Sequence, residues 1–337
     1  MERLTINVDA PRGVLWLARL LACGLLALAS TAQPAALTGI QDYRYLVNGL
    51  PSPEREFPAL VHEFEGLAFT EDGSLWASIA ADPLGTRRDF WRLDVRDNVV
   101  YQVIADTRFE PTARFANPVA LAGEGSRLIV GENFAALRAS GLAINDVLWA
   151  FTPGVSSPEL PDWTFSLPAT ECDEVEGAAT AGGKLYVSCQ TDGTIIEIDP
   201  QSGQIGKKFP LDAQLLGLEA LDDGRLLVGD YSNHRLLVFD LALQQVTDSI
   251  DLASLFTGPD SDYFRLVGEE YLVQVVPSEG FRRVPDPDGL AYRDGTIYMA
   301  FDGDLRIFAI ALRVPEPTTV VLLGLALLCL AWVFRRR

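Results

Sequence analysis

The sequence predicts an all-β fold over residues 40–313, built from repeated units of short strands. Two observations carry this prediction. Short apolar runs alternate with turns rich in Gly, Asp and Asn, and no long run has the periodicity of a helix. A template of strand, tight glycine turn and second strand also recurs along the chain. A third observation separates two apolar segments, one at each end, from this fold and predicts that they direct export.

The five clear copies of the template begin at Glu65, Asn117, Glu176, Leu216 and Asp288. Most of them turn at an Asp-Gly or Gly-Gly pair, because a two-residue hairpin requires positive φ. Further apolar strands follow in most copies, such as residues 194–199 and 235–240. Four strands per unit, repeated at intervals of tens of residues, predict the blades of a β-propeller.

The number of blades is harder to predict than their existence. The interval between Leu216 and Asp288 is long for one compact blade, and Asp262 offers the start of a degenerate extra copy. We therefore expect six blades, with five or seven as the alternatives. We also expect a strand near residues 43–47 to pair with the last blade, because this pairing closes the ring and removes an exposed edge.

One blade carries a family resemblance. Residues 226–240, which include Asp230, Asn233 and Arg235, resemble an NHL repeat. Members of that family form β-propellers, often with six blades. The match is weaker over residues 184–198 and fades elsewhere, so the fold prediction depends mainly on the template. His234 falls inside the NHL-like segment and is interpreted as part of the repeat.

The N-terminal residues 1–32 have the layout of a secretory signal peptide. Three arginines precede an uncharged run over residues 20–29, and small residues follow at 29–32. We expect cleavage after Ala32. Ten apolar residues are too few to span a bilayer, which disfavours a permanent anchor. Lipoprotein processing at Cys23 is the alternative, although apolar residues continue after it.

Residues 314–337 combine three features. Pro315, Glu316 and Pro317 come first, an uncharged stretch over residues 320–334 follows, and three arginines end the segment. The stretch with the two preceding threonines is just long enough to span a membrane, with the arginines on the cytoplasmic side. This order resembles the PEP-CTERM sorting signal of Gram-negative bacteria. The resemblance implies recognition by an exosortase, removal of the helix, and release to the cell surface or an exopolysaccharide matrix. An ordinary single-pass membrane anchor is the alternative.

Charge and cysteine content limit the function classes. The 46 acidic residues outnumber the 27 basic ones, so the formal net charge is -19, which disfavours binding to nucleic acid. Only two His are present, which limits zinc and haem chemistry. Cys172 and Cys189 are the cysteines outside the apolar ends. Export permits a disulfide between them, and two buried thiols are the alternative.

The first residues of the template suggest a cation site. In a propeller the innermost strands line a central channel, so we expect Glu65, Asn117, Glu176 and Asp288 to converge at one mouth. Oxygen ligands with few His favour Ca²⁺ or Mg²⁺, and carboxylates that face each other without a cation repel. The alternative is that an acid followed by Gly only supplies a polar strand start.

A second resemblance concerns the same residues. Glu65 in Phe-Glu-Gly-Leu and Asp288 in Pro-Asp-Gly-Leu look like the first and last metal ligands of regucalcin and gluconolactonase-like propellers. Asn117 is similar to an intervening asparagine. The resemblance implies a metal above a hydrolytic site. The pattern departs from that family because Asp288 lies in the final blade and Glu176 occupies an extra position.

Other candidates are interpreted as structural. His62 stands near Glu65, but a lone His fits no catalytic triad spacing. The acidic run over residues 171–176 lacks the glycine and spacing of an EF-hand, so we expect a solvated loop. Trp76, Trp91 and Trp149 fall in predicted strands and are expected in the core. No catalytic residue is assigned.

Two functional hypotheses follow. The favoured one is an exported, non-enzymatic binding or scaffold propeller that contacts a glycan, a protein or a small molecule outside the inner membrane. The alternative is a calcium-dependent hydrolase that acts on a lactone or an ester, with the metal in the propeller channel.

Overall fold

A computed structural model describes residues 40–45, 63–80, 88–96, 99–109, 117–155, 161–252, 287–301 and 307–312. The expected signal peptide, the sorting segment and the positions of His62 and Asp262 lie outside these ranges. Among the residues that the structure describes, no helix is long and apolar enough to cross a membrane. The described strands all belong to one compact unit, Gly39–Arg313.

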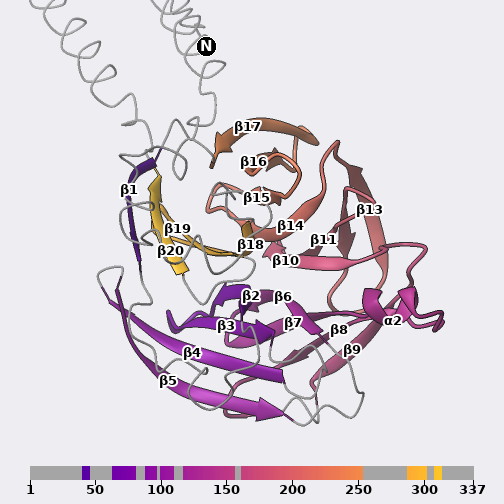
Figure 1. Cartoon of the computed structure of the whole chain (residues 1–337), viewed down its shortest axis with the longest axis horizontal. Helices are drawn as coiled ribbons and strands as arrows, with labels where there is room; N and C mark the ends of the chain where they lie inside the picture. Colours follow the sequence, from indigo (N-terminus) through magenta and orange to yellow (C-terminus); the bar gives the residue numbers. More distant parts are fainter. Residues whose placement is uncertain are drawn as a thin grey trace, which may run out of the picture. The chain divides into compact units, whose positions relative to one another are not determined.

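These residues form five four-stranded antiparallel sheets, the blades of a β-propeller (Figure 1). Blade 1 consists of β2 (Glu63–Phe69), β3 (Leu75–Ala80), β4 (Arg88–Arg96) and β5 (Val99–Phe109). Blade 2 consists of β6 (Asn117–Glu124), β7 (Arg127–Asn133), β8 (Asp146–Phe151) and β9 (Trp163–Leu167). Blade 3 consists of β10 (Val175–Ala181), β11 (Lys184–Cys189), β12 (Thr194–Ile198) and β13 (Ile205–Pro210). Blade 4 consists of β14 (Leu215–Ala220), β15 (Arg225–Asp230), β16 (Arg235–Asp240) and β17 (Gln245–Asp251).

Blade 5 combines the two ends of the propeller. It consists of β18 (Pro287–Arg293), β19 (Thr296–Phe301), β20 (Ile307–Leu312) and β1 (Ile40–Tyr45). β1 pairs with β20 in antiparallel register, with Tyr43 opposite Ile310. The expected closing strand is therefore confirmed, a few residues earlier in the chain than predicted. Because β1 covers the free edge of β20, a strand that precedes blade 1 in the sequence completes the last blade.

The propeller has five blades, one of the numbers that the sequence left open, and not the expected six. The inner strands β2, β6, β10, β14 and β18 neighbour one another around the ring, and β18 contacts both β14 and β2 (Figure 1). A Cβ at Gly217 of β14 would lie 2.0 Å from the carbonyl oxygen of Asp288 in β18. A Cβ at Gly289 would lie 2.7 Å from the backbone carbonyl oxygen of Glu65 in β2. These backbone contacts leave no gap for a further blade between β14 and β18 or between β18 and β2.

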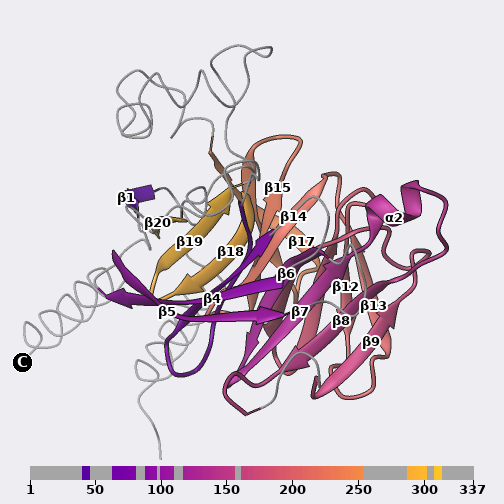
Figure 2. The same ribbon diagram turned by 60° about the horizontal axis from the view of Figure 1, so that its bottom comes forward.

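The predicted hairpin turns lie between the first two strands of the blades. Gly224 and Gly295 have φ of 81° and 79°, a conformation that costs little only for glycine. α2 (Ala135–Ala139) is a short insertion between β7 and β8, and Figure 2 shows it beyond the ends of the strands. It therefore lies on a loop and takes no part in a sheet.

Apolar side chains fill the seams between neighbouring blades. Trp76 and Phe90 of blade 1 pack with Trp149 and Phe151 of blade 2 in one buried cluster. The rings of Trp149 and Phe151 stack with centroids 5.5 Å apart. Truncation of one such aromatic residue to alanine costs about 3–5 kcal/mol of stability. The expectation that Trp76 and Trp149 are core residues is thus confirmed, while the side chain of Trp91 lies outside the described part.

Candidate functional site

The central channel narrows to a small space between the inner strands. This space is too narrow to admit a water molecule, and it is lined by glycines and apolar residues of the inner strands together with Glu176 and Asp288. Glu65 stands at the corresponding place of β2, and both Glu65 and Asp288 are only 9% exposed. Each of these three acids has a polar or electrostatic partner. The structure therefore places the predicted acids at the starts of the inner strands, as expected.

The channel is narrow because glycine is the second residue in four of the five copies, and in three of these it follows an acid. A Cβ at Gly177 would lie 2.5 Å from the Leu218 nitrogen, and Gly217 and Gly289 are equally confined. Glycine at this position lets neighbouring inner strands approach until their backbones nearly touch. This contact accounts for the glycine of the repeated acid-Gly pair, while the acid beside it lies at the channel mouth.

The four predicted metal ligands lie on four inner strands, β2, β6, β10 and β18. Within the described ranges, no group of three or more His, Cys, Asp or Glu side chains has an arrangement that could hold a metal ion. Asn117 begins β6, but its side chain lies outside the described part. The Ca²⁺ site of Glu65, Asn117, Glu176 and Asp288 stays a prediction.

Asn133 organises the acids on one side of the mouth, and sequence reasoning missed it. Its amide nitrogen Nδ2 donates hydrogen bonds to Glu176 Oε1 at 2.7 Å and to Glu174 Oε1 at 3.0 Å. Its Oδ1 accepts a hydrogen bond from the Ala135 N–H at 2.6 Å, at the start of α2. The residue ends β7, so a strand of blade 2 positions carboxylates of blade 3.

Asp146 is a second organising residue that the sequence did not reveal. Its carboxylate is fully buried and forms an ion pair with Arg138 of α2. It also accepts hydrogen bonds from the Phe134 N–H at 2.8 Å and the Val175 N–H at 3.0 Å. A buried carboxylate is stable only when donors surround it, and these donors come from the loop before α2, from α2 and from β10. Asp146 thus ties blade 2 to the first residue of β10.

We call residues 171–176 the acidic loop. Cys172 within this loop forms a disulfide with Cys189 of β11, with Cα atoms 5.3 Å apart, and both cysteines are fully buried. The Asp173 N–H donates to Asp192 Oδ2, and the Asp192 N–H donates to Asp173 Oδ1, both at 3.3 Å. Together with the bonds from Asn133, these contacts hold the loop against blade 3. The loop is therefore attached at several points and not merely solvated.

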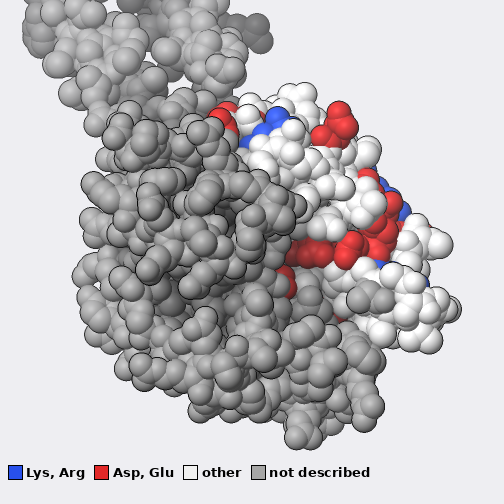
Figure 3. Space-filling model, viewed as in Figure 1, with Lys and Arg blue, Asp and Glu red and all other residues white. Residues whose placement is uncertain are grey.

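Acidic side chains concentrate over the same region. Figure 3 shows Asp and Glu atoms in a hollow over β10 and β11, and further acidic atoms toward the outer strands of that blade. Lys208 forms an ion pair with Glu171 at 2.8 Å, at one end of the acidic loop. A concentration of one charge sign in a hollow raises the local concentration of oppositely charged ligands.

Glu219 is an acid at an unusual position of an inner strand. In blades 1, 3 and 5 the ladder pairs a buried alanine of the inner strand with an aromatic residue, in the pairs Ala68–Trp76, Ala179–Tyr186 and Ala291–Tyr298. In blade 4 the same place holds Glu219 opposite Leu227. Burial raises the pKa of Glu219 to about 8, although the Ala220 N–H donates a 2.9 Å hydrogen bond that opposes the rise. The larger acid is matched with a smaller apolar partner, so the total volume is roughly kept.

One of the two histidines, His234, lies in the described part of the chain. His62 lies outside the described residues, and His234 occupies the turn between β15 and β16 with φ of 48°. In the same turn, Asp230 is fully buried and accepts bonds from Asn233 and Arg235. This network gives the NHL-like residues a structural role, while the family resemblance itself stays a prediction.

Comparison with protein families matches residues 313–337 to the PEP-CTERM protein-sorting motif. No curated protein sequence matches the chain significantly. Among solved structures, the glutaminyl cyclase of Myxococcus xanthus is similar with a TM-score of 0.53 at 17% identity, covering 76% of this chain and 93% of that one. A Bacteroides caccae protein of unknown function has a TM-score of 0.43 at 13% identity, covering 71% and 70%. A luciferin-regenerating enzyme also has a TM-score of 0.43, at 12% identity, covering 74% and 91%.

At such low identity these likenesses concern the fold alone. The family match concerns the C-terminal segment, and it bears out the resemblance that Pro315, Glu316 and Pro317 suggested. A motif of this kind marks an exported protein that an exosortase handles at the cell envelope. The chain is therefore a five-bladed β-propeller that carries a PEP-CTERM sorting motif at residues 313–337.

Proposed function

We propose that this protein is an exported binding module that an exosortase sorts to the cell surface or the exopolysaccharide matrix, and that its main ligand carries positive charge. The observation that carries the proposal is the acidic loop beside the channel mouth. Its carboxylates are concentrated, and a disulfide, Asn133 and Asp146 hold the loop and its surroundings in place. Groups that are ordered before binding lose less conformational entropy when a ligand arrives.

The contacts of Glu176 favour binding over metal-dependent hydrolysis. A catalytic metal needs ligands that converge around an open coordination position. Glu176 Oε1 instead accepts a hydrogen bond from Asn133, and the channel beside it is too narrow to admit a water molecule. The calcium-dependent lactonase or esterase is therefore the less supported of the two functions.

The ligand is tested with a short oligolysine peptide and the purified protein. We expect saturable binding that weakens as salt rises, because the attraction is electrostatic. Glu174→Gln removes one carboxylate of the acidic loop and should weaken binding several-fold. Glu71→Gln removes an equal charge from an exposed hairpin of blade 1 and serves as the control. Equal weakening by both variants, or no dependence on salt, would contradict the proposed site.

The sorting step is tested separately in a host that contains an exosortase. Replacement of Pro315, Glu316 and Pro317 by alanine should leave an uncleaved protein in the inner membrane, as judged by fractionation and immunoblotting. Replacement of Thr318 by serine alters the adjacent position without touching the motif and should leave processing intact. Normal release of the triple variant would refute sorting by this motif.

A further inference from the structure

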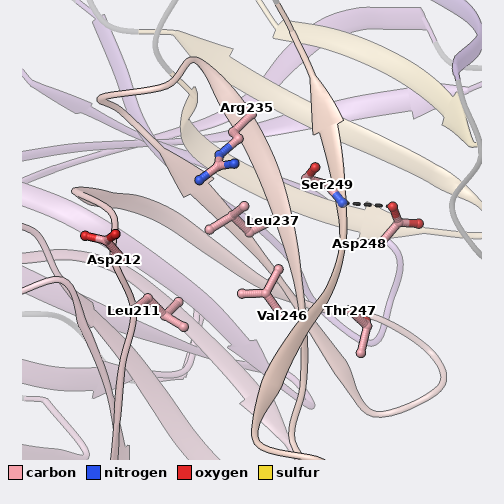
Figure 4. A pocket seen from close by; sticks show the side chains of 8 residues that line it. All are labelled: Leu211, Asp212, Arg235, Leu237, Val246, Thr247, Asp248 and Ser249. Atoms are coloured by element: carbon pink, nitrogen blue, oxygen red, sulfur yellow. Dashed lines mark hydrogen bonds between the residues drawn. The ribbon is translucent and has the colours of Figure 1, made fainter.

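A second pocket lies away from the channel, on the outer side of the seam between blades 3 and 4. Its volume is about 480 Å³, which falls in the range of pockets that bind small molecules. The connection between β13 and β14 forms one wall, and β16 and β17 form the other (Figure 4). Every residue that lines it belongs to the described part of the chain. The pocket therefore provides a concave surface that is independent of the acidic loop.

The floor of this pocket is apolar. Leu237 is 3% exposed and belongs to the core cluster between blades 3 and 4, and Leu211 packs against the same cluster. Val246 of β17 continues this surface outward and is 41% exposed, which is high for a large apolar side chain. The pocket thus extends a buried seam to the solvent, where a ligand with an apolar group would cover Val246.

Arg235 supplies a positive charge in a fixed orientation. Its Nε donates a 2.7 Å hydrogen bond to Asp230, whose buried carboxylate also accepts from Asn233. The Nη groups of Arg235 make no hydrogen bond to any described residue. Figure 4 shows the guanidinium above Leu237, directed to the side of the pocket where Asp212 lies. Guanidinium N–H groups arranged in this way suit a carboxylate.

The remaining polar groups decide which charge the ligand needs. Asp212 is exposed on the opposite wall, and Ser249 lies opposite Leu237 in the ladder, so its hydroxyl shares the pocket face. Asp251 pairs with Arg235 in the ladder, and Asp248, which also lines the pocket, accepts a hydrogen bond from the Ser249 N–H. A ligand that carries only a negative charge would be repelled by these carboxylates. A ligand that carries only a positive charge would be repelled by Arg235. A molecule with both charges is complementary to both walls.

We propose that this pocket binds a small amphipathic zwitterion of about dipeptide size. Its carboxylate accepts hydrogen bonds from the Nη groups of Arg235, its ammonium group lies against Asp212, and its apolar side chain covers Leu237 and Val246. Ligands of this class are free dipeptides and amino acids with apolar side chains. The site depends neither on the sorting motif nor on the acidic loop, so its failure would leave the proposed function intact.

The test uses the purified full-length protein and leucyl-leucine as the probe, with isothermal titration calorimetry up to about 10 mM. We expect saturable binding. Acetylation of the amino terminus and amidation of the carboxyl terminus should each weaken it at least about tenfold, because each removes one charge-assisted interaction. Absence of binding at about 10 mM, or equal binding of the blocked dipeptides, would overturn the proposal.

Two variants locate the site without disturbing the core. Asp212→Asn neutralises the exposed wall, and Val246→Ser removes the exposed apolar floor. Each should weaken binding at least about tenfold. Leu243→Ser is the matched control, because Leu243 is also an exposed apolar residue of blade 4 (58%) but lies outside the pocket. Unchanged affinity in both pocket variants would show that the dipeptide binds elsewhere.

Discussion

Glu219→Gln is expected to remove a large pH dependence from the stability of the propeller. The wild-type carboxyl is buried in the inner strand of blade 4, and burial raises its pKa from 4.5 to about 8. The carboxyl ionises near pH 4.5 in the unfolded chain, while in the folded protein it stays protonated up to about pH 8. Between these values the unfolded state has lost a proton that the folded state keeps, so the free energy of unfolding falls as pH rises.

The size of the effect follows from the shift. A rise from 4.5 to about 8 corresponds to at most about 5 kcal/mol, since one pH unit is worth about 1.4 kcal/mol. The residue lies deep among other protein atoms but keeps part of its surface accessible to water, which screens the charge. We therefore expect the shift to contribute about 2–3 kcal/mol to the free energy of unfolding, half of that maximum. This stabilisation is fully present below pH 4.5 and lost as pH rises through about 8.

The assay is urea unfolding of wild type and Glu219→Gln at pH 4, 6 and 8.5. Gln matches the protonated acid in shape, so the two proteins should be nearly equal at pH 4 and the variant more stable at pH 8.5. Burial and then Asp222 raise the pKa of Tyr292 above its ordinary value of 10, so this group does not titrate in the range. Glu71→Gln on an exposed hairpin is the control. A difference between wild type and Glu219→Gln that stays constant with pH would refute the reasoning.

Three further predictions concern the frame and the channel. The Cys172–Cys189 disulfide closes a loop with a sequence separation of 17, so its reduction should cost about 3 kcal/mol; dithiothreitol should lower the melting temperature of the wild type but leave that of Cys172→Ser/Cys189→Ser unchanged. Gly217→Ala should cost about 3 kcal/mol or more in urea unfolding, because the new methyl would lie 2.0 Å from the Asp288 carbonyl oxygen; an unchanged midpoint would contradict the five-bladed packing. If the channel mouth binds Ca²⁺, millimolar calcium must raise the melting temperature, and no rise would count against that prediction.

Local chemistry made much of the fold predictable. The turn at Asp294-Gly295 follows from two adjacent residues, because only a few residue types tolerate positive φ. Strand alternation and the repeat of the template likewise depend on neighbours in sequence. The C-terminal motif could also be recognised from the sequence, because Pro315, Glu316 and Pro317 are adjacent. The number of blades could not be predicted in this way, because it depends on how closely the inner strands of different blades approach, as at Gly217 and Asp288.

The candidate site shows the same division. Glu176 was predicted at the channel mouth from its place in the template, but its partner Asn133 lies 43 residues away. Asp146 likewise reaches β10 across 29 residues to accept from Val175. Nothing local marks such pairs, because a hydrogen bond between blades needs the relative placement of two sheets.

By itself, the sequence determined the strand-and-turn units and the sorting motif, since these depend on residues that are adjacent in the chain. Only the tertiary structure decided that the ring closes at five blades. It also decided that the acidic loop is fastened by a disulfide and by Asn133, and that Arg235 and Asp212 face one pocket. These features arise from contacts between distant segments, whose energies become available only after the blades have packed together.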